Sequence, residues 1–195
     1  MNELTTLGLV MGAAWVSGMR LYACVATLGL LGRFGLIALP GDLTILTDWW
    51  VIGVAGVLFI VEFFADKIAW LDTAWDAVHT FVRIPAGAVL AWAAYAHTDT
   101  RVQVIACLLG GSLALASHGT KAGIRAAVNH SPEPASNVFV SVAEDFGALG
   151  VLALAIWVPI MAMVVVVLLV IGSFFMMKKV FAGLKALYAR RSSRA

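Results

Sequence analysis

The chain has 195 residues, of which 62% are hydrophobic and 12% are charged, and its formal net charge is +2. An average soluble domain has roughly 45–50% apolar and about 25% charged residues, so this composition excludes an ordinary soluble globule. It also excludes a disordered chain, which needs few apolar residues, and a nucleic-acid-binding protein, which needs a basic face. We therefore expect an all-α bundle of transmembrane helices, with membrane lipid as a partner and no nucleic acid.

The transmembrane helices are predicted from apolar segments of about 20 residues, the length that crosses a hydrocarbon core of about 30 Å. Six spans are expected, and Pro159 is placed at a tight reversal between the last two. One long tilted helix in place of those two is the alternative, and it would leave five spans. The predicted spans are 4–31, 49–68, 70–96, 102–128 and two within 136–177.

A single transmembrane domain is expected over 1–177, followed by a basic tail over 178–195 that holds six of the 13 cations. Lys and Arg are enriched in cytoplasmic segments, so the tail is expected in the cytoplasm. An even number of spans then puts both termini there, in a multi-pass protein of the bacterial cytoplasmic (inner) membrane. Residues 1–4 have no Lys or Arg, so we expect the first helix to be retained rather than cleaved as a signal.

The two halves of the chain show a weak internal similarity. Arg20 in the first span and Lys121 in the fourth each lie two residues after a glycine, and the segments around Glu62 and Glu144 also align. Two inverted three-helix repeats, which are frequent in secondary transporters, would explain both matches. Short matches between apolar helices also arise by chance, and the sequence leaves both explanations open. The halves compared are 1–97 and 102–177.

Charged side chains interrupt the predicted spans, and each costs about 2.5–3.5 kcal/mol near the centre of a membrane helix. They are therefore expected to face the bundle interior, where they pair, line a wet cavity or change protonation state. Glu62 and Glu144 are each predicted about 12 Å from the inner edge, so they should share a depth near the midplane. The charged residues within spans are Arg20, Glu62, Arg83, Lys121, Glu144 and Asp145.

Two spans place several polar residues on one helix face. On the third span these are Asp72, Asp76, His79 and Arg83. On the fourth they are His118, Lys121 and Arg125. Spacings of three and four residues put side chains on the same face of a helix. Such a face can bind an ion or move a proton; equally, Asp76 can pair with His79 and Arg83 only to neutralise a buried surface.

The most polar stretch before the tail is 129–137, which contains two prolines. A plain turn is one explanation, and a re-entrant loop is the other, with Ser136 or Asn137 capping a helix whose N-terminus faces an anion or the carboxylates. His97 and His130 are predicted to be loop histidines. The chain contains no zinc motif, catalytic triad spacing or phosphate-binding loop, so we expect no enzyme and no cofactor other than a bound cation.

These polar segments resemble the signature of an uncharacterised bacterial integral-membrane family, a domain of unknown function, over about residues 5–155. A looser similarity is to small cation exchangers built from two inverted three-helix repeats, each with a Glu-x-Gly-Asp-Lys motif. Glu62 and Asp66 are one residue further apart than in that motif and have no glycine between them, and Glu144-Asp145 lacks the lysine. This similarity implies that these four carboxylates would be the metal ligands.

Three classes of function fit the sequence. The first is a secondary transporter or exchanger for a small cation, coupled to protons through midplane carboxylates. The second is a transporter of an anionic substrate or lipid phosphate that uses Arg20, Arg83, Lys121 and Arg125. The third is a structural or accessory membrane subunit. Gly110-Gly111 leaves a homodimer open. The predicted ion- or substrate-binding residues are Arg20, Glu62, Asp66, Asp76, His79, Arg83, His118, Lys121, Asn137, Glu144 and Asp145.

Overall fold

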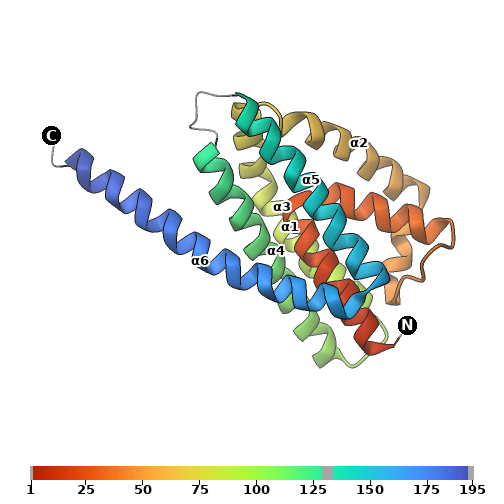
Figure 1. Cartoon of the computed structure of the whole chain (residues 1–195). Helices are drawn as coiled ribbons and strands as arrows, with labels where there is room; N and C mark the ends of the chain where they lie inside the picture. Colours follow the sequence, from red (N-terminus) through yellow and green to blue (C-terminus); the bar gives the residue numbers. More distant parts are fainter. Residues whose placement is uncertain (1, 129–133, 193–195) are drawn as a thin grey trace.

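The computed structural model describes residues 2–128 and 134–192, with only the backbone described over 184–192 (Figure 1). All its regular elements are helices, which confirms the expected all-α bundle. The predicted segment 129–133, with His130, and the side chains of the last part of the basic tail lie outside the described residues. The helices are α1 (Glu3–Arg33), the 3-10 helix η1 (Gly41–Thr47), α2 (Trp49–Ala65), α3 (Ala69–Ala94), α4 (Thr100–Val128), α5 (Pro134–Trp157) and α6 (Pro159–Ser192).

The helix limits follow local signals in the sequence. Asn2 and Asp48 cap α1 and α2, since each side chain accepts a hydrogen bond of 2.8 Å from a backbone N–H in the first turn. The predicted reversal at Pro159 is confirmed, because α5 ends at Trp157 and α6 begins at the proline. Ser136 or Asn137 was expected to cap a helix and this expectation is wrong, because α5 already begins at Pro134 and both residues lie within its first turn.

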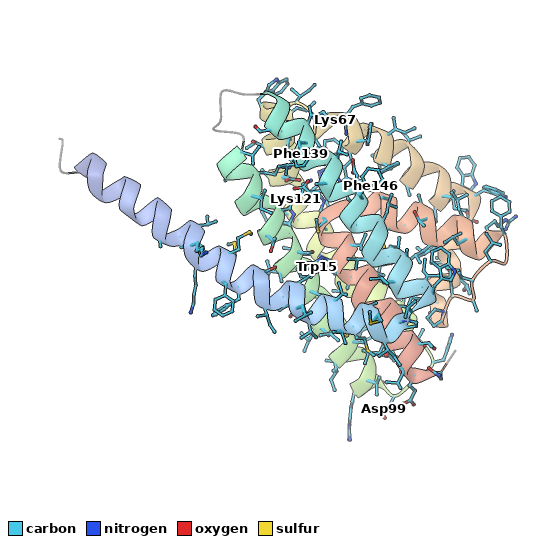
Figure 2. All side chains as sticks on the ribbon, viewed as in Figure 1. Trp15, Lys67, Asp99, Lys121, Phe139 and Phe146 are labelled. Atoms are coloured by element: carbon cyan, nitrogen blue, oxygen red, sulfur yellow. The ribbon has the colours of Figure 1, made fainter. Side chains whose placement is uncertain are left out.

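Five of the described helices are long and apolar enough to cross a membrane, and η1 with α2, bent by 71°, makes a sixth candidate. Their outer surfaces are apolar: Trp50, Phe81 and Phe146 are each more than 70% exposed. Figure 2 shows Phe139 and Phe146 pointing away from the bundle. Such a surface is stable in lipid and not in water, so the protein is a multi-pass membrane protein.

Helix α1 does not run straight. Arg20 leaves the helical conformation, with φ −141° and ψ 67°, and the two arms of α1 turn back on each other there (Figure 1). The Sγ atom of Cys24 consequently lies 3.6 Å from the carbonyl oxygen of Ala13. In a straight helix eleven residues would separate these positions by about 16.5 Å. The predicted span 4–31 is therefore a helix that is broken at Arg20.

Both arms of α1 lie alongside α5, and both extend from Arg20 towards the end of α5 that contains Trp157. Gly8 in the first arm packs against Pro159, and Leu31 in the second arm lies in a small cavity with Trp157. Arg20 lies beside Asp145, near the middle of α5. Helix α1 is thus a re-entrant hairpin whose tip is Arg20, and it packs against every other helix of the described bundle. Hydropathy could not show this, because both arms are as apolar as one straight span.

The two ends of the bundle differ in charge. Asp42 forms an ion pair of 3.0 Å with His97, the predicted loop histidine. Burial raises the pKa of the Tyr95 hydroxyl, and the nearby Glu3 carboxylate raises it further. The start of α1, η1 and the α3–α4 connection therefore meet at one end, which we call the acidic end. The opposite end, the lysine end, contains Lys67, and Figure 2 shows it across the bundle from Asp99.

The amino terminus lies at the acidic end, whereas α6 begins there and runs towards the lysine end, where Met177 packs against Gly123 of α4 (Figure 1). Helices α1 and α4 also start at the same end. Inverted repeats require these two helices to start at opposite ends, so the arrangement gives the three-plus-three repeat no support. Gly110 packs against Gly87 and Ala91 of α3, so this small-residue pattern serves contacts within one chain.

Candidate functional site

Among the described residues, the ion pairs of the interior join eleven charged side chains into one connected set, which we call the charged network. Nine of the eleven are buried; Lys67 and Asp145 are 22% and 17% exposed. The predicted convergence of the membrane charges is confirmed, because none of these side chains faces lipid alone. The members of the network are Arg20, Glu62, Asp66, Lys67, Asp72, Asp76, Arg83, Lys121, Arg125, Glu144 and Asp145.

Arg20, at the tip of the α1 hairpin, connects α1 to α2 and α5. Its guanidinium forms ion pairs with Asp66, which follows α2, and with two carboxylates of α5. The Nε atom lies 2.8 Å from Asp145, and Nη2 lies 3.6 Å from Glu144. Nη2 also donates to the carbonyl oxygen of Ser141 at 3.3 Å. The break in α1 thus places a fully charged side chain among carboxylates at the level of the middle of α5.

Lys121 of α4 is enclosed by carboxylates. Its ammonium lies 3.1 Å from Asp66 and 3.0 Å from Asp76, and the side chain is 0% exposed (Figure 2). One oxygen each from Asp66, Asp72 and Asp76 lies within 4.8 Å of the others, a grouping that fits a metal ion. Of the four predicted metal ligands, only Asp66 belongs to this group. The carboxylates that the structure brings together around Lys121 therefore differ from the predicted metal ligands, with Asp66 as the shared member.

Glu62 and Glu144, which were expected to share a site, lie on separate branches of the charged network. Glu62 pairs with Arg83 of α3, which also donates to Asp76 at 2.6 Å. Glu144 pairs with Arg125 of α4 at 2.8 Å and with Arg20. The expected pairing of Asp76 with Arg83 is present, but Asp76 has Lys121 rather than His79 as its second partner.

Arg125 joins the ends of three helices, in part through Asn137, one of the predicted site residues. Its Nη1 donates to Asn137 Oδ1 at 2.6 Å and to the carbonyl oxygen of Asp66 at 3.2 Å. Asn137 in turn donates to the same Asp66 carbonyl at 3.3 Å. Arg125 also lies 3.7 Å from Asp72. Asn137 therefore holds the start of α5 against the end of α2.

Two histidines border the charged network. His79 Nδ1 lies 2.8 Å from the carbonyl oxygen of Trp75, and Nε2 lies 2.9 Å from the hydroxyl of Tyr22. Because a carbonyl only accepts, Nδ1 of His79 bears a hydrogen. His118 Nε2 lies 2.7 Å from Thr80, and its Nδ1 is near both the Gly18 carbonyl and Arg83. The sequence did not indicate the contacts of Tyr22, Thr80 and Gly18 with these histidines, since only the packing of α1, α3 and α4 brings these residues together.

Lys67 was also not among the predicted site residues. Its ammonium lies 3.8 Å from Asp145, 3.5 Å from Ser141 and over the ring of Phe63. Partial burial lowers the pKa of the Lys67 ammonium, and the Asp145 carboxylate acts in the opposite direction. A lysine placed four residues after an aromatic residue near a helix end is the signal that could have indicated this contact.

Several buried carboxylate oxygens of the charged network have no hydrogen-bond partner among the described residues. They include Oε2 of Glu62, Oδ1 of Asp66 and Oδ2 of Asp76. Each belongs to a carboxylate whose other oxygen holds a cation. A buried polar atom without a partner is costly, so these atoms are the positions of the network best able to accept a further cation or proton.

The family model described as Domain of unknown function (DUF4126) matches residues 7–179. The chain belongs to this family. The match includes the whole charged network and both arms of the α1 hairpin, so the resemblance to an uncharacterised membrane family is confirmed. No curated protein matches the chain, and no solved structure matches it. The looser similarity to small cation exchangers stays a prediction.

Proposed function

We propose that this family member is a secondary transporter for a small cation and that the charged network is its ion-binding site. The charge balance of the network carries the proposal. Among the described residues, five cations face six carboxylates, so this part of the network has one excess negative charge when all its carboxylates are ionised and both histidines are neutral. An uncompensated charge in a membrane interior is unfavourable, so one additional proton or monovalent cation would neutralise the network.

The fold of α1 supports the same proposal. Interrupted helices near the bilayer midplane are common at the substrate sites of secondary transporters, because their free helix ends and a movable side chain lie away from both surfaces. Here the interruption is Arg20, and its three carboxylate partners come from two other parts of the bundle. A displacement of the hairpin tip would therefore change the ion pairs of Asp66, Glu144 and Asp145 together.

The charge balance also distinguishes between the two transport hypotheses. An anionic substrate would need a cation whose charge is not already compensated, but Arg20, Arg83, Lys121 and Arg125 each already pair with at least two carboxylates. An entering anion would increase an excess of negative charge that is already present. A cation reduces it, and we therefore favour a cation over an anion.

We propose further that the lysine end faces the bacterial cytoplasm. Because the α1 hairpin returns to the end where it began, the five helices α2–α6 would cross the bilayer, and the two termini would lie on opposite sides. Lys178 and Lys179 near the lysine end agree with the enrichment of cations on the cytoplasmic side. Charged residues near the acidic end, by contrast, are Glu3, Asp42, Asp48 and Asp99 with Arg33 and Arg101.

Transport by the purified protein in liposomes tests the proposed function. Uptake of Na⁺, K⁺, Mg²⁺, Ca²⁺ and inorganic phosphate would be measured separately under an imposed pH gradient. We expect uptake of at least one of the cations, loss of that uptake in Glu62→Gln, and normal uptake in Asp42→Asn, which removes an exposed carboxylate outside the network. Phosphate uptake alone would favour the anion hypothesis. Folded wild-type protein that moves none of these ions would leave the structural-subunit hypothesis.

A further inference from the structure

We infer that His118 is the residue that binds the proton which neutralises the charged network. This inference rests on the proposed function and replaces the midplane carboxylates as the expected proton carriers. His118 lies on α4, three residues before Lys121, and its side chain is 4% exposed. The inference follows from the hydrogen-bonding capacity of the groups around the two ring nitrogens.

The partner of Nε2 determines that this nitrogen bears a hydrogen. The Thr80 hydroxyl donates its one hydrogen to the backbone carbonyl oxygen of Asp76, 2.9 Å away. Thr80 Oγ1 can then only accept from His118 Nε2, which lies 2.7 Å from it. The neutral form of His118 is therefore the tautomer with a hydrogen on Nε2 and a lone pair on Nδ1.

Nδ1 of His118 lies between one hydrogen-bond acceptor and one hydrogen-bond donor. The carbonyl oxygen of Gly18 is 3.3 Å from it and can only accept a hydrogen bond. Nη1 of Arg83 is 3.4 Å from it and can only donate one. Neutral His118 accepts from Arg83, and protonated His118 donates to Gly18, so each protonation state has a partner already in place. This exchange of partners is the observation that singles out His118.

The charged groups around His118 come from two helices. Arg83 and Asp76 face it from α3, Lys121 from its own helix α4, and α1 contributes the Gly18 carbonyl. Protonation would bring the network to six cations and six carboxylates, so that it has no net charge. The same protonation places a second positive charge 3.4 Å from Arg83. Arg83 holds both Glu62 and Asp76, so proton binding acts directly on these carboxylates.

A proton on His118 and a cation in the network therefore compete, because either one removes the single excess negative charge. A protein that binds one or the other exchanges a cation for a proton across the membrane. Gly18 lies two residues before the tip of the α1 hairpin. The hydrogen bond that protonated His118 donates to the Gly18 carbonyl is therefore made to the segment that would move in the proposed transport cycle. This predicts antiport of protons and cations rather than transport in the same direction.

A route for the proton reaches His118 from the surface. A groove of about 200 Å³ lies between α3 and α4, and Asp76, Thr80, His118 and Arg125 line it. The exposed residues Thr73 and Ala77 form part of its wall. The groove has space for several water molecules and polar groups to bind them. The exposed His97, which pairs with Asp42 outside the network, serves as the comparison residue.

Nitrogen NMR of the full chain in nanodiscs, with ¹⁵N-labelled histidine, tests the inference without a transport assay. In a chain with His79→Gln, His97→Gln and His130→Gln, His118 is the one histidine left, so its signal is assigned even if His118→Gln does not fold. We expect this histidine to have a hydrogen only on Nε2 at high pH and to gain one on Nδ1 as the pH falls between about 8 and 5. A His118 signal that keeps the same protonation state over this range in folded protein would overturn the inference.

Proton release from proteoliposomes separates this inference from the proposed function. A pH-sensitive dye would report protons exchanged on addition of NaCl, KCl or CaCl₂. We expect exchange by wild type and by His97→Gln, which changes an exposed histidine outside the network, and its loss in His118→Gln. If folded His118→Gln still exchanges protons for the cation, His118 is not the proton carrier although the transport proposal stands. If wild type moves no cation but His118 titrates as described, the proposed function fails and the proton site remains.

Discussion

Replacing Ala13 by cysteine tests whether α1 folds back at Arg20. The native Cys24 provides the second thiol, and Cys107 would be replaced by serine so that no other cysteine remains. In the structure the Sγ atom of Cys24 lies 3.6 Å from the carbonyl oxygen of residue 13. A straight helix would separate the two positions by about 16.5 Å, and a disulfide needs Cα atoms within about 7 Å. We therefore expect Ala13→Cys to form a disulfide with Cys24.

The assay is oxidation in native membranes, followed by alkylation of free thiols and counting of the alkylated cysteines by mass spectrometry. A matched control uses the continuous helix α4, with Ala116→Cys and the native Cys107 in a chain whose Cys24 is serine. Nine residues separate this pair by about 13.5 Å, so no internal disulfide is expected. If both thiols of the Ala13→Cys chain react with the alkylating reagent but never oxidise to a disulfide, the hairpin is wrong.

Three further predictions concern charge balance, packing and topology. Glu62→Gln removes the excess negative charge and should leave the thermal midpoint in detergent nearly unchanged. Arg83→Gln doubles the excess and should destabilise the protein by about 3–5 kcal/mol. Equal losses of stability in the two variants would refute the charge balance. Gly12→Ala should lower the stability by about 1–3 kcal/mol because its Cβ would overlap Ala155. The control Gly150→Ala, whose Cβ would have nothing within 4 Å, should leave the stability unchanged. Similar thermal midpoints for the two variants would contradict the packing of α1. Reporter fusions should place the two termini on opposite sides of the membrane, and a shared side would require α1 to cross it.

Local properties of the sequence predicted most of the helices and the burial of the charges. Helix limits depend on apolar length, caps and proline, which the neighbouring residues themselves determine, so the reversal at Pro159 was correct. The pairing of Arg20, Glu144 and Asp145 in one interior network could be predicted because lipid strongly disfavours an isolated charge. These conclusions need no knowledge of which helices are neighbours.

The tertiary structure alone decided how these groups combine. One residue outside the helical conformation, Arg20, reverses α1, and no average over an apolar segment detects a single dihedral change. The packing of the other helices separates Glu62 from Glu144 and places Lys121 between Asp66 and Asp76. The reversal of α1 brings the Gly18 carbonyl to His118. The sequence determined that the charges must be paired, because burying a charge without a partner is unfavourable wherever it occurs. Only the packing of the helices decided the partners, because most of these ion pairs form between side chains that are distant in the chain.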